Sequence, residues 1–275
     1  MPHAFDDQYI GCAEEMERSA SEWLKDEKSN SALFHVVWIN ATNKWEEVKR
    51  NIPLPRSFQD EYGIAIVAYT NRFNRGLNEE VRKNWESQAE YKVNFKFKAF
   101  HYYLTRALQL LRGKCDGMYK QTVYRGVPDV EYHFKGMESN PIRFGHFASS
   151  SLNKKVAKEF AKKGSSDTST FFTIHTCFGV DISKFSYNRS QEEVLIPVHE
   201  MFNVSQGDDG FVLQSTNQTC SYFNCAYLGR EKNKTCVNNT ATRGGVAFPG
   251  GMSPSLFGGS VILIHAAALK LTAGF

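Results

Sequence analysis

The chain has 275 residues, of which 41% are hydrophobic and 13% aromatic, so it can bury a substantial core as one large domain or two small ones. Its formal net charge is only +4, and its lysines and arginines are scattered without an aromatic-interleaved basic stripe, which argues against a nucleic-acid partner. Neither Gly-x-Gly-x-x-Gly nor Gly-x4-Gly-Lys-Ser/Thr occurs, so a nucleotide that binds here binds without a Rossmann loop or a P-loop.

The hydrophobic pattern of residues 8–112 is mainly helical. It is strongest in residues 97–111, where apolar residues recur at spacings of three and four, as on one face of a helix. Residues 64–69 are the exception and are predicted to form a short strand. The predicted helices cover residues 12–28, 31–49, 78–87 and 97–111.

From residue 119 onward the pattern changes to short strands, interrupted by one helix at residues 153–163 that Asn153 can cap. Helices first and strands second predict an α+β domain. The predicted strands cover residues 121–125, 143–148, 170–177, 192–198, 202–205, 210–213 and 222–228.

A polar triplet, Gln191-Glu192-Glu193, runs directly into the apolar residues 194–197. If this segment is extended, its side chains alternate between two faces, so Gln191 and Glu193 project together and Glu192 projects oppositely. A Gln and a Glu that share a cleft can stabilise a developing positive charge, as glycosyl transfer requires. Taken alone, the triplet is more simply interpreted as a solvated strand edge.

Two further polar side chains lie at the ends of predicted strands. Arg125 closes the strand at residues 121–125, and Ser149 follows the strand at residues 143–148. In this order the Arg, the Ser and the Gln-x-Glu resemble the Arg-Ser-Glu signature of the vertebrate ecto-ADP-ribosyltransferases, which cleave NAD at its nicotinamide bond and transfer the ADP-ribose. Segments that look like family segments, in family order, are residues 4–9, 101–105, 143–145 and 193–197.

The resemblance covers about residues 4–228 and implies a disulfide-stapled α+β fold, with a mostly helical N-terminal half packed on a β-sheet ADP-ribosyltransferase core. It implies NAD+ as the substrate, with NADP+ as a second donor and no metal. The implied catalytic residues are Arg125, Ser149 and Glu193. Arg125 would hold the pyrophosphate through planar, bidentate donors, and Ser149 would bond the nicotinamide-side ribose and hold Glu193. The Glu193 carboxylate would bond the 2′-hydroxyl and stabilise the oxocarbenium-like ribose.

Three more residues are candidates for the NAD pocket. Gly126 has no side chain, so backbone groups could approach the nicotinamide amide. Phe160 could stack on the nicotinamide ring, although a Phe on a helix face more often belongs to the core. Tyr69 is a similar pocket candidate, and ordinary core packing explains it equally well. Ser150 and Ser151 can cap the helix that follows them.

Gln191 departs from the Glu-x-Glu of the members that modify arginine, in which the first Glu is thought to hold and activate the acceptor guanidinium. A neutral amide offers neither a full negative charge nor useful basicity. The acceptor is therefore open: a protein side chain, a small guanidino compound, or water, which would make the chain chiefly an NAD+ glycohydrolase. A catalytically silent surface antigen and an unrelated disulfide-stapled adhesion domain are the other interpretations.

The number of cysteines is even and no Cys-x2-Cys pair occurs, which favours disulfides over zinc. Sequence alone does not assign the pairs. The family resemblance suggests Cys12 with Cys225 and Cys115 with Cys177, which leaves Cys220 with Cys236. Disulfides indicate an oxidising compartment, and six Asn-x-Ser/Thr triplets predict a glycoprotein. The triplets begin at Asn40, Asn188, Asn203, Asn217, Asn233 and Asn238.

The two ends of the chain give conflicting signals about cellular location. No apolar leader follows Met1, whereas residues 256–269 are largely apolar, follow the small-residue stretch 244–255, and are shorter than the roughly 20 residues of a spanning helix. We expect a catalytic domain at 1–240 and, at 241–275, a signal for a glycosylphosphatidylinositol anchor that is cleaved near Gly244. An ordinary C-terminal helix is the alternative. The expected location is extracellular, with a lipid anchor in the outer leaflet and the leader missing from this sequence.

Overall fold

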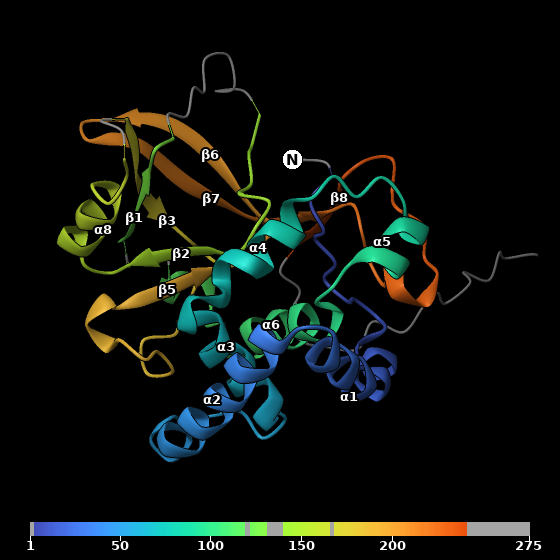
Figure 1. The fold of residues 1–275 in the computed structure, drawn as a ribbon. Helices are drawn as coiled ribbons and strands as arrows, with labels where there is room; N and C mark the ends of the chain where they lie inside the picture. The colour runs from blue at the N-terminus through green and yellow to red at the C-terminus, as the bar shows by residue number, and fades with distance from the viewer. Residues whose placement is uncertain (1–2, 119–121, 131–139, 166–167, 241–275) are drawn as a thin grey trace, which may run out of the picture. The chain divides into compact units, whose positions relative to one another are not determined.

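The computed structural model describes residues 3–118, 122–130, 140–165 and 168–240 (Figure 1). Within these ranges the first half is helical and the second half forms a sheet, which confirms the predicted α+β class. The helices of the first half are α1 (Ala13–Asn30), α2 (Ala32–Val48), α3 (Asp60–Ala68), α4 (Asn74–Arg82), α5 (Gln88–Asn94), α6 (Lys98–Leu111) and α7 (Cys115–Met118).

The predicted strand at residues 64–69 is wrong, because α3 and a following π-helical segment (Tyr69–Phe73) occupy these residues. Residues 62–68 are all buried, and a Cβ added to Gly63 would lie 2.5 Å from the indole of Trp45 in α2. A run that is apolar on every side has no period that separates a buried helix from a buried strand. The glycine at position 63 allows α3 to pack closely against α2. The sequence pattern alone does not reveal this contact.

Eight strands form one sheet in the described ranges, in the order β4-β5-β2-β1-β3-β7-β6, with β8 paired to β7. β3 and β7 run parallel, and their other pairings are antiparallel. Helix α8 (Lys154–Ala161) lies beside β1 and begins where predicted, since the Asn153 side chain accepts from the backbone N–H of Lys155. The strands are β1 (Thr122–Pro128), β2 (Ala148–Ser151), β3 (Ser169–His175), β4 (Val180–Asp181), β5 (Glu193–Ile196), β6 (Glu200–Gly207), β7 (Gly210–Ser221) and β8 (Val237–Thr240).

Several predicted elements shift or disappear. The predicted helix at 78–87 is α4, which starts and ends earlier, and the strand predicted at 143–148 begins only at Ala148. Residues 222–228 form a loop and a short 3-10 turn in place of the predicted strand. The carboxylates of Asp6 and Asp7 occupy backbone donors that a strand would offer to a neighbour. Four N–H groups donate to them: those of Tyr222, Phe223, Cys225 and Ala226.

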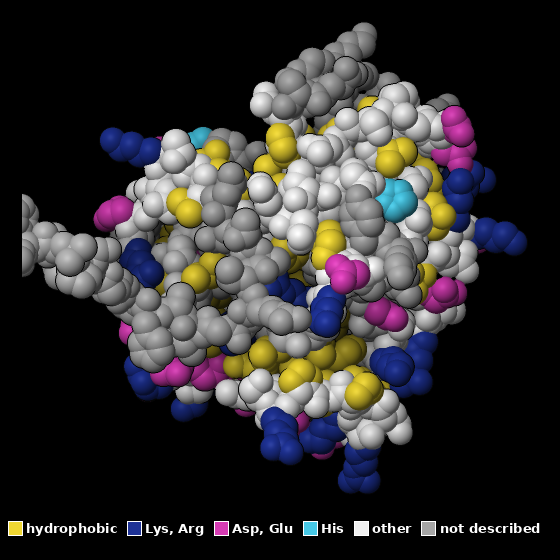
Figure 2. Space-filling model, turned by 180° about the vertical axis from the view of Figure 1, so that it is seen from behind, with side chains coloured by type: hydrophobic (Ala, Val, Ile, Leu, Met, Phe, Trp, Pro, Cys, Tyr) yellow, Lys and Arg dark blue, Asp and Glu magenta, His cyan; other side chains and the backbone are white. Residues whose placement is uncertain are grey.

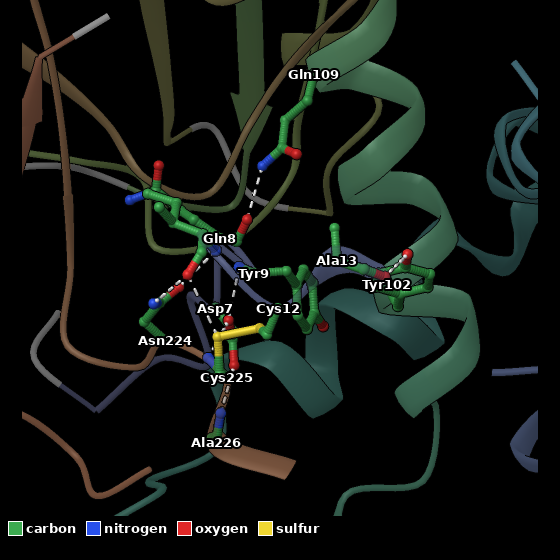
Figure 3. Close-up of a disulfide and its surroundings, with 11 residues drawn as sticks. Asp7, Gln8, Tyr9, Cys12, Ala13, Tyr102, Gln109, Asn224, Cys225 and Ala226 are labelled. Carbon is green, nitrogen blue, oxygen red and sulfur yellow. Dashed lines mark hydrogen bonds between the residues drawn. A yellow bond between two sulfur atoms is a disulfide. The ribbon is translucent and has the colours of Figure 1, made fainter. Parts of the chain in front are cut away.

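The three expected disulfides are confirmed: Cys12–Cys225, Cys115–Cys177 and Cys220–Cys236. Figure 3 shows the first of them beside Asp7, whose carboxylate also accepts from the backbone N–H of Tyr9. Since 213 residues separate Cys12 from Cys225, this bridge closes nearly the whole described chain into one loop.

Apolar side chains on the two faces of the sheet belong to two separate clusters. Along β5, Leu195 packs with the helices, whereas Val194 and Ile196 pack in the cluster on the other face. By strand alternation, Glu193 therefore projects to the helical side, with Leu195.

Lys and Arg side chains lie among Asp and Glu side chains on the face drawn in Figure 2, in keeping with the scattered charge of the sequence. None of the helices in the described ranges combines the length and the apolar character that crossing a bilayer takes.

Candidate active site

Arg125, Ser149 and Glu193 come together on three neighbouring strands, β1, β2 and β5. The Arg125 guanidinium donates from Nη1 to the backbone carbonyl of Ser149, and the Ser149 side chain lies close enough to the Glu193 carboxylate to influence its pKa. Arg125 is also close enough to act on Glu193 by its charge. The three residues therefore form one cluster, although the predicted strand ends are wrong for two of them: Arg125 lies inside β1 and Ser149 inside β2, and only Glu193 lies at a strand end.

Glu193 is buried, with only 7% of its surface exposed. Burial raises the pKa of its carboxyl above the ordinary value, and the nearby Ser149 hydroxyl and the Arg125 charge oppose that rise only in part. A carboxylate in such surroundings is poorly hydrated, so it interacts more strongly with a nearby positive charge than it would in water.

Tyr69 supports this cluster from the helical half. Its hydroxyl donates to the Phe147 carbonyl at 3.0 Å and accepts from the Asn78 amide at 3.1 Å. The Ser149 hydroxyl donates to the same oxygen at 3.4 Å. Burial raises the pKa of Tyr69 to about 12, with a contribution from the Glu193 charge, so the phenol stays protonated at neutral pH. Tyr69 is therefore both a buried core residue and a neighbour of Ser149 in the cluster.

Asn78 is a residue that the sequence did not reveal. Its amide donates to the Phe147 carbonyl at 2.9 Å, and its oxygen accepts from the Phe147 N–H at 3.1 Å. This pairing holds the residue before β2 against α4. No short-range pattern connects the two positions, which are 69 residues apart, and therefore no sequence motif could have indicated it.

His146 also escaped prediction, although it follows the family-like segment 143–145. One Arg125 terminal nitrogen, Nη2, lies 3.5 Å from His146 Nε2, and His146 Nδ1 lies 3.0 Å from the Phe144 carbonyl. Burial and the Arg125 charge lower the pKa of His146 to about 3, so the ring is neutral. Because the carbonyl requires a donor at Nδ1, Nε2 is left as an acceptor for Arg125. A neutral His146 can therefore orient the guanidinium.

Packing against α8 gives a structural reason for a glycine at position 126, and the predicted role of Gly126 beside the nicotinamide amide stays a prediction. A Cβ at this position would lie 2.1 Å from the Ala157 carbonyl and 2.7 Å from the Ala161 nitrogen, both in α8. The side chain is therefore excluded by the backbone of a helix that packs directly on β1. An approach by the nicotinamide amide is not needed to explain it.

Phe160 lies on α8 and is 37% exposed, so core packing does not account for it. The ammonium of Lys163 sits 4.0 Å from its ring centroid. An accessible ring on α8 keeps Phe160 a candidate for stacking, and its place in a bound complex stays a prediction.

Gln191 does not belong to β5, so the alternation argument for residues 191–193 is wrong. Gln191 ends a 3-10 turn (Arg189–Gln191), and Glu192 follows in the left-handed region with φ of 45°. The strand begins at Glu193. A turn, and not the strand period, therefore sets the direction in which Gln191 points.

The arrangement of the cluster can be compared with known proteins. The family model for NAD:arginine ADP-ribosyltransferases matches residues 1–221. The chain belongs to this family. Its relatives include human ecto-ADP-ribosyltransferase 5, which is 45% identical over 247 residues covering 86% of this chain and 82% of the relative. T-cell ecto-ADP-ribosyltransferase 2 of Rattus norvegicus is 40% identical over 240 residues, with the same coverage.

A solved structure of the same family has the same fold. The crystal structure of the eucaryotic mono-ADP-ribosyltransferase ART2.2 superposes with a TM-score of 0.69 at 40% identity, covering 82% of this chain and 96% of that chain. A mutant of ART2.2 was solved in complex with NADH and matches with a TM-score of 0.70 at 39% identity. Family membership and fold thus agree over the part of the chain that carries the Arg-Ser-Glu cluster.

Proposed function

We propose that this chain is a mono-ADP-ribosyltransferase that cleaves the nicotinamide–ribose bond of NAD+ and transfers the ADP-ribose. The observation that carries the proposal is the cluster of Arg125, Ser149 and a buried Glu193 on adjacent strands. The complexes of ART2.2 mutants with NADH and with NAD support the same ligand class for this fold. NADP+ is a second donor in the proposal.

In the proposed reaction the bond between the ribose C1′ and the nicotinamide nitrogen breaks, and its electron pair leaves with neutral nicotinamide. The ribose becomes oxocarbenium-like, and the Glu193 carboxylate stabilises it through the 2′-hydroxyl. Ser149 holds that carboxylate, and Arg125, oriented by His146, holds the pyrophosphate. The acceptor attacks C1′ and loses a proton to solvent.

No metal is needed for this chemistry in our proposal. In the described part of the chain, no group of three His, Cys, Asp or Glu residues comes together in a way that could hold a metal ion.

Our first proposal for the acceptor is arginine in a protein or a small guanidino compound, because the matching family model is that of NAD:arginine ADP-ribosyltransferases. Gln191 favours a second candidate, NAD+ glycohydrolysis, because a neutral amide cannot neutralise an incoming guanidinium. The third candidate is a surface antigen without catalytic activity. The intact cluster of Arg125, Ser149 and Glu193 argues against it.

The test incubates the purified protein with NAD+ and agmatine and follows nicotinamide, free ADP-ribose and ADP-ribosyl-agmatine together. We expect nicotinamide release, and we expect Gln191→Glu to raise the share transferred to agmatine. An absence of nicotinamide release would favour the silent antigen. If the Gln191→Glu product ratio stays at the wild-type value, Gln191 does not determine the acceptor.

The proposal extends to the location of the enzyme. We propose a catalytic domain at residues 1–240 that is extracellular, N-glycosylated and held on the outer membrane leaflet by a lipid anchor. The disulfides and the "ecto" names of its relatives support an oxidising, extracellular setting. The proposed anchor signal, 241–275, lies outside the described residues. Release from cells by a phosphatidylinositol-specific phospholipase tests the anchor.

A further inference from the structure

Three consecutive serines in β2 have three different surroundings. Ser149 contacts Tyr69 and Glu193 in the cluster described above. Ser150 is buried, and its hydroxyl has no hydrogen-bond partner among the residues that the structure describes. Ser151 is equally buried, but its hydroxyl donates to the Gln191 carbonyl at 2.6 Å and accepts from the Asn153 N–H at 3.0 Å.

The hydrogen bond from Ser151 acts on Gln191 and not on Glu193. Glu193 is in the strand ladder, where it pairs with Ser151 across β2 and β5. The preceding residue, Glu192, is also tied to this edge, since its carbonyl accepts from the Leu152 N–H at 3.0 Å. Gln191 lies beyond the ladder, in the 3-10 turn, so its carbonyl depends on the Ser151 side chain for a link to the sheet.

The same hydroxyl connects the turn to α8. Asn153, whose N–H donates to Ser151, caps α8 through its own side chain, which also donates to the Glu192 carboxylate at 3.3 Å. Helix α8 packs its backbone on Gly126, next to Arg125. The buried Ser151 hydroxyl therefore connects the turn that carries Gln191 with α8, the helix that packs beside Arg125.

We propose that Ser151 is a positioning residue that holds Gln191 in place and so sets how ADP-ribose is divided between a side-chain acceptor and water. The inference rests on the proposed function, because it concerns the acceptor side of that site. A bulky acceptor must be oriented by the turn, whereas water needs no such orientation. Loss of the Ser151 hydroxyl therefore disfavours transfer more than hydrolysis.

The experiment compares Ser151→Ala with the matched control Ser150→Ala, in the full chain. Both variants delete a buried hydroxyl from the same strand, but only the first deletes a hydrogen bond. Amide hydrogen exchange of a peptide covering residues 188–193 measures the order of the turn without using activity. Products from NAD+ and agmatine are measured with the Gln191→Glu substitution present throughout, because that background is expected to favour transfer.

We expect Ser151→Ala to speed exchange in the turn and to lower the ratio of ADP-ribosyl-agmatine to free ADP-ribose about fivefold, the size of one lost hydrogen bond. The KM for NAD+ should stay unchanged, Ser150→Ala should match its parent, and Ser151→Thr, which keeps the hydroxyl, should restore the ratio.

Equal exchange in the two alanine variants would overturn the positioning role. Faster exchange with an unmoved product ratio would overturn the link to the acceptor. If the parent releases no nicotinamide, the proposed function fails, and with it the inference about the acceptor, while the exchange data still decide whether Ser151 orders the turn.

Discussion

Replacement of Gly126 by alanine should destabilise the protein, because the new methyl group has no space. The Cβ would lie 2.1 Å from the Ala157 carbonyl, whereas ordinary contact begins at 3.4 Å. The added Cβ would clash with the backbone of α8 and with the Ala161 Cβ. Because neither is the tip of a flexible side chain, α8 must move away from β1. Overpacking of this kind costs about 1–3 kcal/mol, and we expect the upper end, about 3 kcal/mol.

Thermal unfolding measures this cost. At about 2–4 °C per kcal/mol for a chain of this size, Gly126→Ala should lower Tm by about 6–12 °C. Gly113→Ala is the matched control, because a Cβ on Gly113 meets nothing within 4 Å, and its Tm should not fall. The KM for NAD+ should also rise, since displacement of β1 moves Arg125. An unchanged Tm with a raised KM would refute the packing argument and would mean that Gly126 serves to admit the nicotinamide.

We predict that Glu193→Gln abolishes nearly all nicotinamide release without lowering Tm; activity above about a tenth of wild type, a loss of under about 1.4 kcal/mol, would remove Glu193 from its proposed role. Since burial raises the pKa of Glu193, the acid limb of the pH profile of kcat/KM should lie at higher pH than an exposed glutamate would give, and a limb at the ordinary position would contradict this. The same shift means that the folded protein retains this proton to a higher pH than the unfolded chain, so the contribution of Glu193 to stability decreases as pH rises through that interval. Replacing both Cys12 and Cys225 by serine should reduce the free energy of unfolding by about 2–4 kcal/mol in urea titrations, and a loss under about 1 kcal/mol would show that the Asp7 hydrogen bonds hold this loop without the bridge.

Short apolar runs with polar neighbours were the most informative local pattern of the sequence. Polar residues next to short apolar runs marked Arg125, Ser149 and Glu193 as candidates, the family resemblance assigned them to one site, and the sheet order brings their strands together. The three residues meet although Arg125 lies inside β1, Ser149 lies inside β2 and Glu193 begins β5, because the type and order of the residues, and not a place at strand ends, carried the resemblance. The alternation argument failed for Gln191, because the chain is not extended there: a 3-10 turn ends at Gln191 and Glu192 is left-handed, so the strand period does not reach Gln191.

By itself, the sequence determined the α+β class and, through the family resemblance, the candidate cluster and the three disulfides. These depend on residue type and order, which a single chain displays. Only the tertiary structure decided that residues 64–69 are helical, that α8 excludes a side chain at Gly126, and that Ser151 rather than Ser150 holds Gln191. Each of these depends on a backbone or side-chain atom from a distant part of the chain, and a contact between distant segments has no period or spacing that a local pattern could reveal.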